Sequence, residues 1–433
     1  MNLGALSLEN APGFWTPLRF FLTVPVFGIL AAVIIFLDGG RLFDSRWLAA
    51  SLAVTHIFTL GYIAMAMLGA LFQMLPVVMG TSLPRAGRTA TIVHLLMTVG
   101  TLCLVFAFLL QIPLLFTAAI TLLVPVLILF AVGVIAAIFR AGKTRTTARA
   151  VQLAALGLIV TVLIGAELAS GHAFESVPLN RGLTNYHAAW GVIGWILILV
   201  IGISGQVIPM FLTTPPYPNL FNKWLAYLLI VLLGAGSFLP LQGLEQICVA
   251  LAGILMLAYA GVTLNLLARR RRKRFDITDW FWRTGMLCLV LGTGTYIFGY
   301  FGGKLNGADI SMLTGLLLLV GFAVSLINGM LYKIVPFLVW LNLRMPVVMG
   351  KLEPGTRYYT PNIHEVIEVR PMKLQFIFHV TGLLLLVTAV FLKGFPVYVA
   401  ATAMLVSNLL LLANLSHAVR LYRKYSSQVI PLQ

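Results

Sequence analysis

Charged residues are scarce in this sequence. They make up 9% of its 433 residues, whereas 60% are apolar; an average soluble protein is about a quarter charged and about half apolar. The composition therefore excludes an ordinary soluble enzyme.

Cysteine is also rare. The three cysteines lie inside apolar stretches without a CxxC pair, which excludes a disulfide framework and favours packing roles for their side chains. The sequence also lacks a nucleophile triad, a phosphate-binding loop and a dedicated metal motif.

Long apolar stretches are what the sequence has instead. A membrane-spanning helix needs roughly 20 apolar residues, because the hydrocarbon core is about 30 Å thick and each residue rises about 1.5 Å. Twelve stretches meet this length, and their approximate limits are 17–37, 47–78, 89–110, 113–139, 148–170, 184–213, 222–239, 243–267, 279–302, 309–341, 374–393 and 396–419. The sequence thus predicts an all-α integral membrane protein of the bacterial inner membrane, with residues 1–433 in one multi-pass domain. The first stretch follows Glu9 instead of a basic region, so we expect a retained helix and not a signal peptide.

Acidic residues are the rarer of the two charge types. There are 12 Asp and Glu against 29 Lys and Arg, a net charge of +17. In a soluble protein this excess would suggest a nucleic-acid partner, but in a membrane protein basic residues mark the cytoplasmic side. With the N-terminus inside, 24 basic residues lie at cytoplasmic ends, and the five outside are Arg41, Arg46, Arg181, Lys304 and Lys393. The charge therefore predicts both termini in the cytoplasm, a lipid bilayer as the partner and no nucleic acid.

One short motif occurs three times. It reads G-x-x-x-[QK]-h-h-P, where h is apolar, and its copies are Gly69, Gln73 and Pro76; Gly202, Gln206 and Pro209; and Gly329, Lys333 and Pro336. The copies lie 133 and 127 residues apart in the second, sixth and tenth stretches, which predicts three pseudo-repeated four-helix units at roughly 17–139, 148–267 and 279–419.

The motif has a structural interpretation that we favour over a binding one. Proline bends a helix and frees a carbonyl, the polar residue three positions earlier could satisfy that carbonyl, and the glycine lets another helix approach closely. Lys333 replaces glutamine in the third copy. We expect it to reach the membrane surface, with contact to an anionic headgroup or a quinone as the alternative.

Histidines inside the apolar stretches are the candidate functional residues, because ionisable groups in a membrane are costly. His56 lies deepest from the outer surface, in the second stretch, and is either a metal or haem ligand or a buried histidine bonded to a neighbouring helix. His187 opens the sixth stretch and His172 lies in the outer loop before it. Met312 in the tenth stretch is near the position equivalent to His56, and methionine can be an axial haem ligand, although core packing is its commoner role.

The remaining polar residues carry weaker expectations. Glu167 is the acid that we expect to enter a span. It is either a carboxylate of a metal site or proton relay, with His172 or His187 as its partner, or an interfacial side chain. The other histidines near helix ends are expected to be interfacial, and they are His94, His379 and His417.

The helix count, the three units and the histidine in the second stretch resemble subunit I of the haem-copper oxidase superfamily. Residues 55–76, THIFTLGYIAMAMLGALFQMLP, are similar to the second helix of that family, where a histidine ligates low-spin haem. Residues 185–218, NYHAAWGVIGWILILVIGISGQVIPMFLTTPPYP, and 331–341, LYKIVPFLVWL, are similar to small bacterial relatives such as NnrS. That resemblance implies haem b, copper or both as cofactors and a link to nitric-oxide stress.

The sequence also departs from the oxidase pattern. Oxidases carry further copper and haem histidines in their seventh and tenth helices, but 222–239 and 309–341 contain no histidine here. The resemblance therefore carries over His56 and His187 alone as ligands, and we do not expect an oxygen-reducing oxidase. The leading hypothesis is a haem- or copper-binding membrane protein that handles nitric oxide or another redox partner. The alternatives are a transporter or permease without a cofactor, and a quinone-binding partner of a respiratory complex.

Overall fold

The computed structural model describes residues 12–142, 146–272, 274–305, 309–348 and 361–426. Helices form nearly all of this part of the chain, and it contains no strand. The elements are α1 (Trp15–Asp38), η3 (Gly39–Phe43), α2 (Ala49–His56), η4 (Ile57–Ala64), α3 (Met65–Met79), α4 (Ala86–Leu110), α5 (Pro113–Arg140), α6 (Thr146–Ala173), α7 (Leu183–Ala189), η5 (Trp190–Leu197), α8 (Ile198–Leu212), α9 (Asn219–Phe238), α10 (Leu244–Ala268), α11 (Ile277–Tyr300), α12 (Ile310–Leu316), η6 (Leu317–Val324), α13 (Ser325–Val348), α14 (Val369–Phe391) and α15 (Phe395–Ser426).

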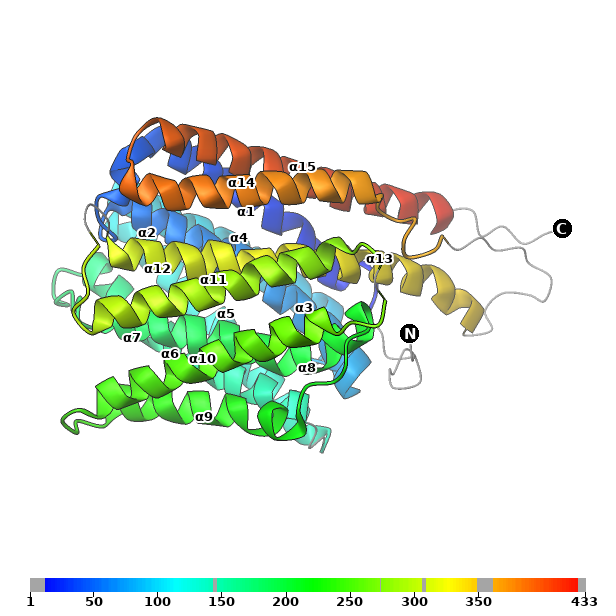
Figure 1. Ribbon diagram of the computed structural model, residues 1–433, viewed down its shortest axis with the longest axis horizontal. Helices are drawn as coiled ribbons and strands as arrows, with labels where there is room; N and C mark the ends of the chain where they lie inside the picture. Colours follow the sequence, from blue (N-terminus) through cyan, green and yellow to red (C-terminus); the bar gives the residue numbers. More distant parts are fainter. Residues whose placement is uncertain (1–11, 143–145, 273, 306–308, 349–360, 427–433) are drawn as a thin grey trace.

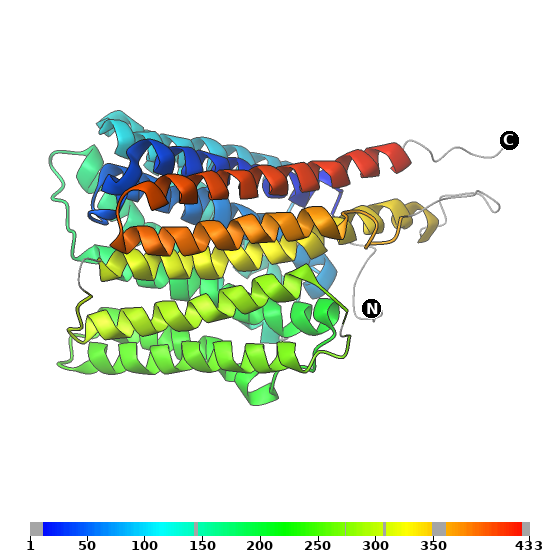
Figure 2. The same ribbon diagram turned by 45° about the horizontal axis from the view of Figure 1, so that its top comes forward.

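The helices lie side by side along one direction. Figures 1 and 2 show α1, α14 and α15 grouped at one edge of the bundle and α9 and α10 near the other. The ring of Phe14, just before α1, stacks on Tyr422 near the end of α15, with 3.7 Å between ring centres. The start of the first helix and the end of the last helix therefore lie at the same end of the bundle.

Eleven helical segments of the described chain are long and apolar enough to cross a membrane. They confirm a multi-pass helical membrane protein, but the expected number was twelve. The remaining stretch, expected at 279–302, is the helix α11 of 24 residues. It packs against α10, α13 and η6, and its four threonines, four glycines, Asp279 and Arg283 lower its hydropathy.

Three π-helical segments interrupt the helices that carry the repeated motif. η4, η5 and η6 each contain eight residues. Each begins twelve residues before the motif glycine, at 57 before 69, 190 before 202 and 317 before 329. Such wide turns are rare and are frequently found at functional sites. Their equal register in three helices is therefore a shared feature of how these helices are built.

The motif glycines allow close helix packing, as predicted. A Cβ atom on Gly69 would lie 2.6 Å from the Cβ of Phe20 in α1. On Gly202 it would lie 2.5 Å from the Cβ of Ala150 in α6, and on Gly329 2.7 Å from the Cβ of Phe281 in α11. Each glycine thus faces the helix that opens its own expected four-helix unit.

Gln73 differs from its predicted role in the motif, and Lys333 forms an ion pair. The buried amide of Gln73 has no hydrogen-bond partner on either atom, so it does not satisfy a carbonyl freed by Pro76. Lys333 forms an ion pair with the residue just before α11. Its Nζ lies 2.6 Å from Oδ2 of Asp276, whose Oδ1 accepts a hydrogen bond from the backbone N–H of Thr278 at the start of α11. Lys333 therefore ties α13 to the first turn of α11.

Two buried polar residues were also placed wrongly by the sequence. His379 was expected at an interface but is 1% exposed, and its Nε2 lies 2.8 Å from the hydroxyl of Ser325. Asp279, which was not expected to enter a span, lies inside α11 and is 3% exposed. Its Oδ2 lies 3.1 Å from Nε of Arg283 and 3.7 Å from Nη2 of Arg270. The arginine four residues after Asp279 was the sequence signal for this buried charge cluster.

Candidate functional site

His56 and His187 meet in the structure. His56 is the last residue of α2, and His187 lies in α7, the short helix that opens the sixth expected span. Their ring centres are 6.4 Å apart, and their planes differ by 25°. The sequence placed these histidines in different four-helix units, and the fold makes them neighbours near one end of the bundle.

Both imidazoles are held in the same way. Nδ1 of His56 lies 2.8 Å from the carbonyl oxygen of Leu52, and Nδ1 of His187 lies 3.0 Å from that of Thr161. A carbonyl can only accept a hydrogen bond, so each Nδ1 carries the hydrogen and each Nε2 keeps its lone pair. Metal-binding histidines show this arrangement, in which one ring nitrogen donates to a carbonyl and the other binds the ion.

Glycines of α6 bring its backbone close to the sixth span. A Cβ on Gly165 would lie 2.7 Å from Cε1 of His187, and one on Gly157 would lie 2.2 Å from the carbonyl oxygen of Gly194 in η5. Only hydrogen atoms on these two α-carbons leave room for the contact. The same close approach puts the carbonyl of Thr161 within reach of the His187 ring.

Aromatic rings cover the other side of the pair. Phe108 of α4 stacks on His56 with 5.2 Å between ring centres. His172 lies next to the same aromatic rings. Its ring stacks on Phe116 with 4.9 Å between ring centres and meets Phe108 edge to face at 5.8 Å. Phe108 therefore lies beside both histidines, and His172 is an outer neighbour of the site.

Glu167 and Met312 do not join the histidine pair. Glu167 is exposed on α6; it comes two residues after Gly165, which rotates it by about 200° from the face that meets His187. Met312 lines a cavity that also touches α2 and α7, but through Leu52, Thr55, Ala188 and Ala189. Neither His56 nor His187 lines this cavity.

The separation of the two rings can be compared with that expected for a shared ion. Two Nε2 atoms that both pointed at one ion, at about 2.0–2.1 Å, would hold their ring centres about 6 Å apart on a straight line; the ring centres of His56 and His187 are 6.4 Å apart, with nearly parallel planes. Imidazole is a good ligand for copper and iron. In the described part of the chain, no cluster of three or more His, Cys, Asp or Glu side chains is arranged to hold a metal.

Several residues of this site gave no sequence signal. Phe108 is one aromatic residue in an apolar helix, and Thr161 contributes a backbone carbonyl, which every residue has. Arg46 was counted only as a basic residue of the outer side, whereas its side chain lines the cavity.

Comparison with known proteins leaves the identification to the residues themselves. No protein-family model matches this sequence. No curated protein matches it significantly.

Proposed function

We propose that this chain is a membrane protein that binds copper, or haem iron, through His56 and His187. The meeting of these two imidazoles, each with its Nδ1 bonded to a carbonyl, is the observation that supports it. A bound copper or iron ion supplies one-electron redox chemistry and an affinity for nitric oxide. The protein's part is to fix both rings, to keep their Nε2 atoms unprotonated and to limit water on the side covered by Phe108.

The proposal includes a scaffold related to subunit I of the haem-copper oxidases, built as three four-helix units. The equal register of η4, η5 and η6 and the contacts of the three motif glycines support these units. A redox partner or a quinone would deliver electrons. Because histidines are missing from α9, α12 and α13, the proposed activity is nitric-oxide or redox handling and not oxygen reduction.

Metal analysis of the purified protein is the direct test. We expect about one copper ion per chain after loading with Cu(I), or a haem absorption band after expression with adequate haem. Absence of both under these conditions would contradict the proposal. It would favour a cofactor-free transporter, or a quinone-binding respiratory partner, on the same scaffold.

The proposed orientation has both termini in the cytoplasm of a bacterial cell, which puts the histidine pair near the outer surface. Lys304 and Arg272 are exposed and lie in connections expected on opposite sides. A membrane-impermeant maleimide is expected to label Lys304→Cys in intact spheroplasts and Arg272→Cys only after permeabilisation. The wild-type protein is the control, because Cys248 and Cys288 are buried and Cys103 is partly buried. Labelling in the reverse pattern would contradict this orientation.

A further inference from the structure

A cavity of about 560 Å³ lies between α2, α7, α10, α11 and α12, separate from the histidine pair. Its volume is in the range of about 300–1,000 Å³ that is typical of small-molecule sites. Part of the lining follows α12 and η6 from Ser311 to Val320, a length of ten residues of helix or about 13 Å. The cavity is therefore long enough for an extended ligand.

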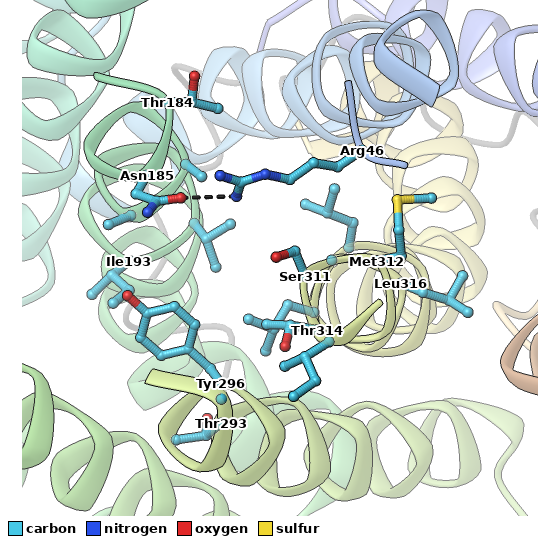
Figure 3. Close-up of a pocket in the computed structure, with 18 of the residues that line it drawn as sticks. Arg46, Thr184, Asn185, Ile193, Thr293, Tyr296, Ser311, Met312, Thr314 and Leu316 are labelled. Atoms are coloured by element: carbon cyan, nitrogen blue, oxygen red, sulfur yellow. Dashed lines mark hydrogen bonds between the residues drawn. The ribbon is translucent and has the colours of Figure 1, made fainter. Parts of the chain in front are cut away.

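Polarity changes along this length. Arg46, Thr184, Asn185 and Ser311 lie at the end near the helix starts, and Figure 3 shows the Arg46 side chain reaching across the opening to Asn185. The deeper wall is apolar and is formed by Phe58, Met256, Leu319, Val320 and Leu386. Such a gradient matches an amphiphile whose head group lies at the mouth and whose chain extends inward.

Arg46 provides a positive charge at the mouth. Its Nη1 donates a hydrogen bond to Oδ1 of Asn185 at 2.8 Å, and its guanidinium lies 4.5 Å from the centre of the Trp47 ring. Among the described residues, Arg46 forms no ion pair with an acid. Glu245 also lines the mouth, but it is exposed and lies beside Tyr296 and Tyr300. The guanidinium therefore keeps donors for an anionic group.

Two hydroxyl groups in the cavity wall have no partner. Thr293 and Thr314 are 3% and 8% exposed, and their Oγ1 atoms form no hydrogen bond. Thr55 lines the same cavity but donates to the carbonyl of Ser51, as a helical threonine commonly does. A buried hydroxyl without a partner is costly, so Thr293 and Thr314 are available to a ligand. Together with Arg46 and the free amide N–H groups of Asn185, they make the outer half of the cavity rich in donors.

We propose that this cavity binds a single-chain amphiphile with an anionic oxygen head group, a fatty carboxylate or a lysophosphate. The head group accepts hydrogen bonds from Arg46, Thr293 and Thr314, and the chain occupies the apolar inner part. Carboxylate and phosphate oxygens are acceptors only, which matches a wall that offers donors. This site is independent of the proposed metal site.

Titration of the purified full-length protein with hexadecanoate, followed by native mass spectrometry, tests the proposal. We expect saturable binding that weakens at least about tenfold in Arg46→Gln, because a hydrogen bond to a charged group is lost. Arg181→Gln is the matched control. The Arg181 guanidinium lies 5.2 Å from the centre of the same Trp47 ring but does not line the cavity. The affinity of the Arg181→Gln variant for hexadecanoate should therefore change less than about twofold.

The threonines give a second variant that keeps the fold. Thr293→Val and Thr314→Val remove hydroxyls without partners, so we expect unchanged thermal stability and weaker hexadecanoate binding. Comparison with 1-hexadecanoyl lysophosphatidate identifies the head group, since the better acceptor binds more tightly. Equal binding of hexadecanol and hexadecanoate, or an equal loss in the Arg46 and Arg181 variants, would overturn the proposal. Metal content, measured on the same samples, reports separately on the histidine site.

Discussion

Replacing His56 with alanine is expected to remove bound copper almost completely. The proposed ligands of this ion are two imidazoles, and no group of three or more His, Cys, Asp or Glu side chains in the described residues could replace them, so loss of either leaves one. Removing a hydrogen-bond partner of a ligand already costs 10- to 100-fold in metal affinity in typical proteins, and removing a ligand should cost about 100-fold or more. His187→Ala should have the same effect. Copper per chain, measured by elemental analysis with a competing chelator, checks both variants.

Two other histidines serve as controls for this measurement. His417 is exposed on α15, and His172 is separated from His56 by Phe108. Alanine at either position should leave copper affinity within about threefold of the wild type. If His56→Ala retained wild-type copper while His417→Ala lost it, the ion would lie elsewhere and the His56–His187 site would be wrong. If all variants kept their copper, a non-specific surface site would explain the metal.

Asp279→Ala is expected to produce the largest loss of stability. The carboxylate lies between Arg283 and Arg270, and the side chains of Asp279 and Arg270 are 5% and 12% exposed. Removing one partner of a buried ion pair leaves an uncompensated charge, at a typical cost of about 3–5 kcal/mol. In detergent this should appear as a melting temperature several degrees below that of the wild type. Retention on size-exclusion chromatography after mild heating is a second measurement.

Asp44→Ala is the matched control, because it breaks an ion pair that is exposed. Asp44 and Lys393 are 2.7 Å apart, with side chains 52% and 41% exposed. Exposed pairs contribute about 0–1 kcal/mol, so this variant should melt within a degree or two of the wild type. Equal melting temperatures for Asp279→Ala and Asp44→Ala would show that burial does not increase the contribution of the Asp279 cluster.

The sequence predicted the membrane-spanning helices and their close packing better than it predicted the contacts of polar side chains. Apolar length alone located the spans, because a bilayer imposes the same requirement on every crossing. The stretch that forms α11 was also located, but α11 is not among the eleven helices that are long and apolar enough to cross a membrane. The motif predicted close packing at Gly69, Gly202 and Gly329, since a missing Cβ has a direct steric effect. It did not predict that the Gln73 amide has no hydrogen-bond partner or that Lys333 pairs with Asp276, because a long polar side chain can reach several different groups.

The same contrast holds for the candidate ligands. The rarity of histidine inside apolar stretches selected His56 and His187, because burying an ionisable group is costly wherever it lies. Glu167 and Met312 were selected by depth and by register, but a helix rotates each residue by about 100°, so depth does not determine which side a residue faces. Helix rotation also explains why Arg46 and the partnerless threonines of the cavity were not recognised.

Scarcity of charge and its uneven distribution came from the sequence alone: they determined a multi-pass helical membrane protein and predicted its orientation. These properties depend on composition and order along the chain, which folding does not change. Only the tertiary structure decided which polar residues meet. It brought His56 to His187, separated both from Met312, and enclosed Arg46, Thr293 and Thr314 in one cavity, because such contacts depend on how distant helices are rotated and packed against one another.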